Sequence, residues 1–251
     1  MTPSDPLPAT PHLTPADLGR ALRAGLADFA AAPVYGLFFG GILTAAGLGL
    51  AALGAGLFTW TLTLTLGFPL VAPFLAVGLY EVSRRREAGA PLTPGAILGV
   101  LWAERGRQMP WLGMFLLIAF LFWSFFAHIL FALVLGPSAL TGPVSDWASY
   151  ADGRIWTLLA AEIAFGAACA ALVFALTVMA IPLLLDRELD LVTAMRLSYR
   201  TVRANPGTLL LWSMIVAGLT LAALAPWFLG LPLVLPVLAH ASWHLYRRAF
   251  D

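Results

Sequence analysis

The feature that most constrains this fold is a stretch without any charged residue, which runs from Phe29 to Tyr80. As a single helix it would be roughly 78 Å long, whereas the hydrocarbon core of a bilayer is about 30 Å thick. The stretch must therefore fold back on itself, and the glycines at residues 54–56 predict the turn. We expect two membrane-spanning helices here, at residues 33–54 and 58–80.

Four further spans are expected at residues 110–135, at 154–185, and in the two parts of the uncharged run that divides near Pro226. Soluble domains carry about 25% charged residues. This chain has only 11% charged and 61% hydrophobic residues, so it cannot cover a surface that faces water. The sequence therefore predicts an all-α polytopic membrane protein, with six transmembrane helices arranged as three hairpins.

The basic residues indicate how these spans are oriented. All fourteen are arginines, and only Arg154, which follows a predicted loop at 136–153, falls on one side of the expected membrane. Cytoplasmic loops carry the excess of basic residues, which predicts a multi-pass protein of a bacterial inner membrane with both termini in the cytoplasm. The net charge of +1 gives no reason to expect nucleic acid as a partner.

Internal similarity suggests that one unit occurs three times. Residues 66–76 and 229–239 share eight of eleven residues at one constant offset, so the second and sixth spans are expected to be equivalent. We predict a disordered cytoplasmic tail at 1–13 and one membrane domain at 14–251. Its units are expected at 14–92, 93–187 and 188–251.

Each unit is expected to begin with an amphipathic helix that lies in the membrane interface. Thr14, Thr93 and Asp190 are suited to cap the three helix starts, and a proline leads from each helix into a span: Pro33, Pro110 and Pro206. In the first helix the apolar side chains keep helical spacing while the polar ones face elsewhere; the apolar set is Leu18, Leu22, Leu26 and Phe29, and the polar set is Arg20, Arg23 and Asp28. Arginines on these helices suggest contact with anionic lipid headgroups.

Two polar residues are expected inside the membrane, where ionisable groups are costly and mark candidate functional sites. His128 lies on the third span and Glu162 on the fourth, at similar depth, and a hydrogen bond between them would lower the cost of burying both. A proton relay or a ligand site open to the outer face is one interpretation. A purely structural pair is the other.

His240 and His244 stand four residues apart on one face of the sixth span, near the inner interface. Such spacing can hold a metal or contribute to a haem site, but no carboxylate or cysteine lies beside them in sequence. We therefore expect hydrogen bonding at the interface, and no metal or other cofactor.

Two carboxylate–arginine combinations end predicted spans at the cytoplasmic side: Glu81 with Arg84, and Asp186 with Arg187. We expect an ion-pair network between the units, which would join the interfacial helices to the bundle. A binding site at this position is the alternative.

Three groups of residues resemble a bacterial family of predicted integral membrane proteins that is a domain of unknown function. They are Gly78-Leu79-Tyr80-Glu81-Val82-Ser83-Arg84-Arg85 with Glu87; Pro182, Asp186-Arg187, Asp190, Ala194, Ser198 and Asn205-Pro206; and Pro236, His240 and Trp243-His244-Leu245-Tyr246-Arg247. Some members of the family are labelled as cytochrome c oxidase subunits. The resemblance implies an inner-membrane protein without an established activity.

No phosphate-binding loop, metalloprotease motif or serine nucleophile elbow is present in the sequence. We therefore expect a non-catalytic membrane protein with an accessory, scaffold or assembly role. Its expected partners are the lipid bilayer, anionic lipid headgroups and other membrane-complex subunits. A small-molecule or lipid transporter with a polar site between helices is the first alternative, and a haem- or metal-binding membrane protein is the second.

Overall fold

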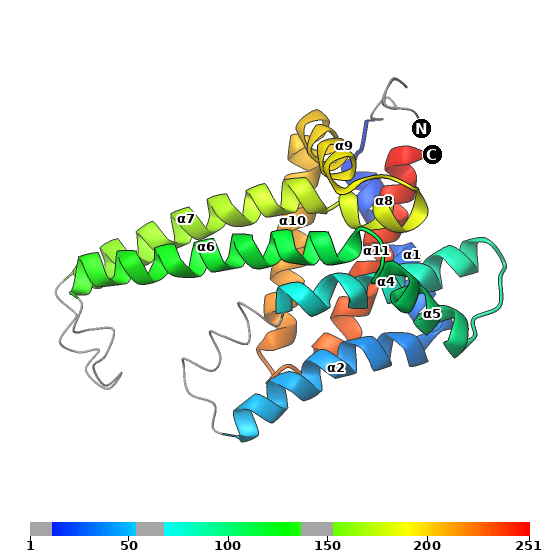
Figure 1. The fold of residues 1–251 in the computed structure, drawn as a ribbon, viewed down its shortest axis with the longest axis horizontal. Helices are drawn as coiled ribbons and strands as arrows, with labels where there is room; N and C mark the ends of the chain where they lie inside the picture. Colours follow the sequence, from blue (N-terminus) through cyan, green and yellow to red (C-terminus); the bar gives the residue numbers. More distant parts are fainter. Residues whose placement is uncertain (1–11, 54–67, 137–152) are drawn as a thin grey trace.

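The computed structural model describes residues 12–53, 68–136 and 153–251, and within these ranges the fold is all-α, with 85% of residues in helices and no strand. Figure 1 shows their arrangement. The helices are α1 (Pro15–Ala31), α2 (Pro33–Ala52), α4 (Phe68–Glu87), α5 (Pro94–Glu104), α6 (Met109–Leu135), α7 (Arg154–Thr177), α8 (Ala180–Asp186), α9 (Leu191–Ala204), α10 (Pro206–Leu224) and α11 (Leu231–Phe250). The predicted turn at 54–56 and most of the predicted loop at 136–153 lie outside the described residues.

The predicted starts of the three helices that precede the spans are confirmed, but the prediction that all three are amphipathic is wrong for α5, which is apolar on all sides. Thr14 caps α1 in a capping box with Asp17, Thr93 caps α5, and the Asp190 side chain accepts from the Thr193 N–H at the start of α9. Each cap satisfies a backbone N–H that has no partner inside its helix. These helices therefore begin where short-range hydrogen bonding alone would start them.

The predicted tail ends earlier than expected. Leu13, assigned to the disordered segment, is buried, and its N–H donates to Asn205 Oδ1 over 2.7 Å. Its carbonyl accepts from the Thr208 hydroxyl over 2.9 Å. Residues before Pro15 are thus already attached to the turn between α9 and α10, which sequence spacing could not indicate.

Three of the described helical segments are long and apolar enough to cross a membrane: Met109–Leu135, Arg154–Asp186 and Pro206–Leu224. The α1–α2 pair, bent by 98°, would make a fourth if it is counted as one span; its charged residues all belong to α1. The described parts of α4 and α11 do not meet this criterion, because their polar ends begin after Tyr80 and Trp243. The structure therefore supports three or four candidate spans, and the six-helix arrangement stays a prediction.

Two of the proline elbows have the same backbone geometry. Ala32, between α1 and α2, has φ −140° and ψ 53°, and Asn205, between α9 and α10, has φ −132° and ψ 51°. At both residues the N–H donates to carbonyls of the preceding helical turn. The following proline occupies the first helical position, where it has no N–H to leave unbonded. The connection from α5 to α6 differs, since residues 105–108 separate the two helices.

Helix α11 occupies the middle of the packing. It contacts α1, α2 and α4 most extensively, and its buried Trp243 and Tyr246 belong to the main core. Close approach to α2 depends on Gly40, because a Cβ there would lie 2.6 Å from Pro232 Cα. In Figure 1 the neighbouring helices α6 and α7 extend away from this body to the left, while α10 runs from top to bottom.

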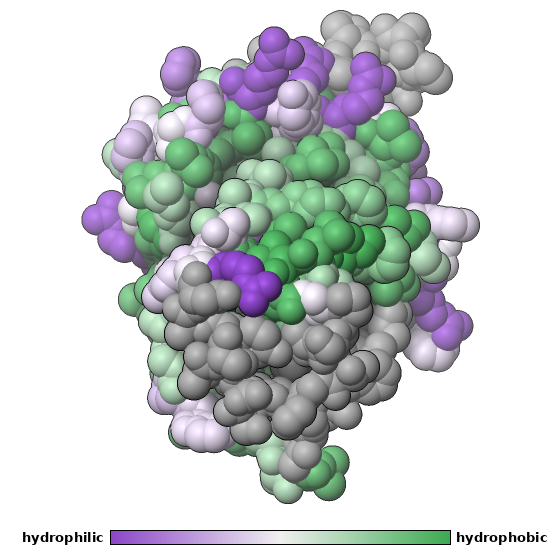
Figure 2. Space-filling view, turned by 90° about the vertical axis from the view of Figure 1, so that its left-hand side faces the viewer, coloured by the Kyte–Doolittle hydropathy of each residue, from purple (hydrophilic) through white to green (hydrophobic). Residues whose placement is uncertain are grey.

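The surface is apolar over most of the long helices. On α6, large side chains such as Trp111, Phe122, Phe125 and Leu133 are all more than half exposed. Figure 2 shows hydrophilic residues gathered at the top, above a broad hydrophobic band. Such exposure would be unfavourable in water and is expected for a surface that faces lipid.

Candidate functional site

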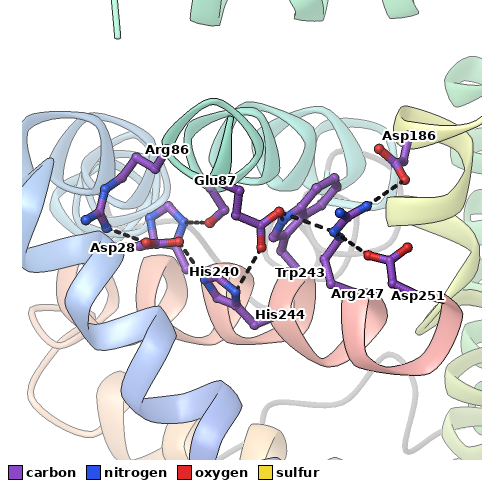
Figure 3. Close-up of polar contacts among 10 residues, drawn as sticks. Asp28, Arg86, Glu87, Asp186, His240, Trp243, His244, Arg247 and Asp251 are labelled. Atoms are coloured by element: carbon purple, nitrogen blue, oxygen red, sulfur yellow. Dashed lines mark hydrogen bonds and ion pairs between the residues drawn. The ribbon is translucent and has the colours of Figure 1, made fainter. Parts of the chain in front are cut away.

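Polar side chains from α1, α4 and α11 meet at one end of the packed body and form what we call the polar cluster (Figure 3). Its members are Asp28, Ser83, Arg86, Glu87, His240 and His244, with Trp243, Asp186, Arg247 and Asp251 at its edge. Arg86 and Glu87 come from the polar end of α4, and His244 and Arg247 from that of α11, whereas Asp28 belongs to α1 and Asp186 to α8.

His244 lies at the centre of the cluster, between two carboxylates from two other helices. Its Nε2 is 2.8 Å from Asp28 Oδ2, and its Nδ1 is 3.2 Å from Glu87 Oε1. Burial by itself would lower the pKa of this imidazole, but the bonds to Asp28 and Glu87 outweigh burial and raise it to about 9. Since both ring nitrogens face acceptors, the doubly protonated cation is the form that fits.

Asp28 is the most deeply buried carboxylate of the cluster, with 6% of its surface exposed. Besides His244 it pairs with Arg86 of α4. Burial raises the pKa of this carboxyl, whereas hydrogen bonds from His244 and Ser83 and the nearby positive charge lower it, and the net effect is a lowered pKa. Gly25 allows α1 to approach α11 closely enough for Asp28 to reach His244, because a Cβ at this position would lie 2.6 Å from the backbone N of Ala241.

Glu87 extends the cluster toward α8 and the carboxyl terminus. It accepts from Trp243 Nε1 over 3.0 Å and pairs with Arg247 Nε at 3.3 Å. Burial opposes ionisation, but hydrogen bonds from His244 and Trp243 and the charge of Arg247 lower the pKa of this carboxyl. Arg247 also pairs with Asp186 at 3.5 Å and with Asp251 at 2.8 Å, so cations and carboxylates alternate along the cluster.

His240 has a different environment, although it stands one helical turn from His244. Its ring is fully buried, and its Nδ1 shares a hydrogen bond of 2.8 Å with Ser83 Oγ. Its Nε2 has no hydrogen-bond partner among the described residues. The two histidines thus face different partners, and their side chains do not converge on a common position.

The carboxylate–arginine combinations expected to form a network behave in two ways. Asp186 accepts from the Tyr246 hydroxyl over 2.7 Å, and Arg187 donates to the Phe250 carbonyl over 3.0 Å, so both connect α8 to α11. Glu81 instead bonds Arg84 and Arg85 of its own helix, each over 2.7 Å. The first combination joins two predicted units, and the second stabilises the end of α4.

His128 and Glu162 lie on the neighbouring helices α6 and α7, whose contact includes stacked Phe126 and Phe165 rings with centroids 3.8 Å apart. The His128 side chain is exposed, and its Nδ1 bonds the backbone carbonyl of Ser124 over 2.7 Å. No hydrogen bond joins His128 to Glu162 in the ranges that the structure covers. The two residues are neighbours, but their arrangement is open to the lipid-facing surface rather than enclosed.

Within the described residues, no group of three or more His, Cys, Asp and Glu side chains is placed to hold a metal ion. Both nitrogens of His244 already face carboxylates, so this ring has no lone pair for a metal. Two surface concavities lie away from the polar cluster. One of about 300 Å³ is lined by Arg107, Gln108, Leu184, Glu188, Leu189 and Asp190. The other, on α9, is described below.

Sequence reasoning missed Asp28, Ser83 and Glu87 as members of the site. In the first amphipathic helix, Asp28 was expected to lie off the face that carries Leu18, Leu22, Leu26 and Phe29. The structure corrects the position of Asp28, which is buried together with Asp17, Leu18, Ala21 and Gly25, while Leu26 is 56% exposed. The sequence did contain one signal: the small residues Ala21 and Gly25 stand at helical spacing between Asp17 and Asp28. Small residues allow another helix to approach closely, and the two carboxylates indicate that this helix supplies cations.

The model of one protein family matches residues 61–186, half of the chain, and that family is described as a predicted integral membrane protein (DUF2189). This match covers α4 to α8 and is shorter than the similarity noted from the sequence motifs. Searches of curated proteins and of solved structures found no match.

Proposed function

Because the chain belongs to this family of predicted integral membrane proteins (DUF2189), we propose that it acts in the bilayer as a non-catalytic accessory, scaffold or assembly component. One observation carries the proposal: the polar cluster is closed by its own ion pairs. Asp28, Glu87 and Asp186 each bond a cation or donor from another helix. A set of charges that neutralise one another stabilises a helix arrangement and leaves none of these three carboxylates without a partner.

The proposed topology has six spans in three hairpins, in a bacterial inner membrane, with both termini cytoplasmic. The arginine distribution supports it, and the polar ends of α1, α4, α8 and α11 lie together, as they must if these ends share one side. The polar cluster then lies at the cytoplasmic interface.

The proposed threefold repeat has support from packing. The first helix of each unit contacts the second long helix of the preceding unit in cyclic order: α5 packs on α4, α9 on α7 and α8, and α1 on α11. Ends of the three second helices also contact one another, since α4 and α11 both pack on α8. The matching elbows at Ala32 and Asn205 agree with this arrangement. In this cyclic arrangement the first unit contacts the last, so ion pairs between these two units would hold the bundle together.

Anionic lipid headgroups are the proposed partners of the arginines that the fold does not use. Eight arginines of the described chain pair with carboxylates, and Arg105 stacks on Trp102 at 3.2 Å. Four exposed arginines on α1 and α9 have no ion pair within the same ranges: Arg23, Arg196, Arg200 and Arg203. Their position on two amphipathic helices suits contact with lipid phosphates.

The transporter alternative has less support at the break between α7 and α8. In transporters, unwound backbone groups of broken helices coordinate substrate or ions. Here Ser198 of α9 satisfies both of the groups that the break frees, accepting from the Met179 N–H over 3.1 Å and donating to the Ala175 carbonyl over 2.8 Å. A break closed by a protein side chain favours a structural role.

Purification of the tagged full-length protein from its native membrane in mild detergent tests the proposed function. We expect other membrane proteins to copurify in a constant ratio, and the Asp28→Asn variant to lose them. Glu188→Gln, which changes an exposed carboxylate that forms no ion pair within the described residues, is the matched control and should retain them. Substrate- or proton-coupled flux in proteoliposomes that Glu162→Gln abolishes would contradict the proposal and favour transport.

A further inference from the structure

Helix α9 carries a shallow groove on the side that faces away from the core. The groove has a volume of about 410 Å³ and is lined by Leu176 of α7 and by Val192, Met195, Arg196, Tyr199 and Arg200 of α9. Its volume falls in the range of small-molecule sites, roughly 300–1,000 Å³. The lining combines an apolar floor with two guanidinium groups.

The groove lies on a helix that is held firmly in place. The opposite face of α9 is buried through Ala194, Leu197, Ser198 and Thr201. Ser198 joins it to the α7–α8 break, as described above, and Asn205 receives the N–H of Leu13 at its other end. A groove whose floor is fixed from both ends requires little reorganisation when a ligand binds, which favours affinity.

Arg196 and Arg200 are separated by one helical turn, so both side chains leave the same face of α9. Both are exposed, and neither pairs with a carboxylate in the described ranges. Guanidinium groups bind phosphate oxygens through paired hydrogen bonds. Immediately beside them, Val192 is 64% exposed and Tyr199 is 45% exposed, although both would prefer an apolar neighbour.

We propose that this groove binds one anionic phospholipid, with its phosphate on Arg196 and Arg200 and the upper part of an acyl chain along Leu176, Val192 and Met195. Charge complementarity selects the headgroup, and the apolar floor selects a lipid over a free anion. In the arrangement proposed above, α9 lies at the cytoplasmic interface, where phosphates and the first methylenes occur together. This inference rests on the proposed interfacial position of α9 and adds a defined site to it.

Native mass spectrometry of the full-length protein in detergent, titrated with dioleoyl phosphatidylglycerol or dioleoyl phosphatidylcholine, tests this site. We expect one saturable phosphatidylglycerol adduct and a clear preference over phosphatidylcholine. The Arg196→Gln/Arg200→Gln double variant should weaken that adduct about 30-fold, because each arginine near a charged headgroup contributes about fivefold. Val192→Trp, which fills the groove and keeps both arginines, should weaken it as well.

Arg203→Gln is the matched control, because Arg203 is exposed on the same helix and outside the groove. Its adduct should match that of the unchanged protein. If Arg203→Gln weakened the phosphatidylglycerol adduct as much as the double variant does, or if Val192→Trp had no effect on it, the proposed site would be overturned. The lipid would then be held by diffuse charge attraction. Displacement of the lipid by millimolar inorganic phosphate would overturn the assignment to lipid. Absence of a saturable adduct would dismiss the groove but leave the copurification result unchanged, so the two proposals fail separately.

Discussion

The imidazole Nε2 of His244 lies 2.8 Å from Oδ2 of Asp28, although 216 residues separate the two in the chain. This contact joins α1 to α11, and a second tie between the same helices runs from Arg248 Nε to Asp17 Oδ1 over 3.0 Å. The first and last helices of the described chain are therefore held together by charge, and the polar cluster closes the bundle at this end.

Removal of the Asp28 charge should destabilise the fold strongly. Asp28→Asn would remove the carboxylate that pairs with Arg86 and one of the two carboxylates that face His244, and breaking a buried ion pair on one side costs about 3–5 kcal/mol. We expect a loss of about 3 kcal/mol in the free energy of unfolding, measured by titration with sodium dodecyl sulfate in mixed micelles. Glu188→Gln should change this free energy by less than about 0.5 kcal/mol.

Stability should decrease at alkaline pH through His244. Its pKa in the folded protein, about 9, is above its ordinary value of 6.5, so its contribution is complete below pH 6.5 and is lost as the pH rises to about 9. Asp28 and Glu87 have lowered pKa values, so their contributions are present above their ordinary values of 3.8 and 4.5 and are lost in more acidic solution. The contributions of these three groups together are therefore greatest between about pH 5 and 6.5 and should decrease on either side, as followed by the midpoint of thermal unfolding.

The variant His244→Gln isolates the alkaline part of this profile. Gln cannot titrate, so the decrease between pH 6.5 and pH 9 should disappear, while overall stability is reduced because Asp28 and Glu87 lose their shared cation. If the variant and the unchanged protein show the same decrease over this range, His244 is not the titrating group.

Close packing of α1 on α11 should be sensitive to a single methyl group at Gly25. Gly25→Ala would place a Cβ 2.6 Å from both the Ala241 N and the Val237 carbonyl, which are backbone atoms that cannot move aside separately. We expect a destabilisation of about 1–3 kcal/mol. Gly19→Ala is the control in the same helix, because nothing lies within 4 Å of its Cβ. It should be neutral or stabilising by up to about 1 kcal/mol from helix propensity.

The break between α7 and α8 should depend on one hydroxyl. Ser198→Ala would leave the Met179 N–H and the Ala175 carbonyl without their partner, and a buried polar group without a hydrogen bond costs about 1–3 kcal/mol. Ser213→Ala removes a hydroxyl that bonds only the Leu210 carbonyl of its own helix, and this control should lose less than about 0.5 kcal/mol. Equal effects of the two substitutions would contradict a special role for Ser198.

Local features of the fold were predictable because short-range interactions determine them. Thr14, Thr93 and Asp190 cap their helices with hydrogen bonds to residues three positions away, and Pro33 and Pro206 begin helices for steric reasons. These signals are complete within a few residues of sequence. They located these helices and the elbows without any knowledge of packing.

The partners of the polar cluster were not predictable in this way. Asp186 and Arg187 contact α11, as the predicted network requires, but Asp28 was assigned to the wrong face of its helix. A helix with apolar residues on two sides can bury either side, and the choice here depends on Gly25 meeting Ala241. That contact is a property of two distant segments together, which one-dimensional spacing does not contain.

Labelling of single cysteines with a membrane-impermeant maleimide tests the central claim most directly, which is that the polar ends of α4 and α9 share the cytoplasmic side of a membrane-embedded bundle. On a Cys169→Ala background, the exposed positions Ala88, Arg200 and Gly153 would each be changed to Cys. We expect Ala88→Cys and Arg200→Cys to react only in inside-out vesicles, and Gly153→Cys to react in intact spheroplasts. Reaction of Ala88→Cys and Arg200→Cys from opposite sides would contradict the account.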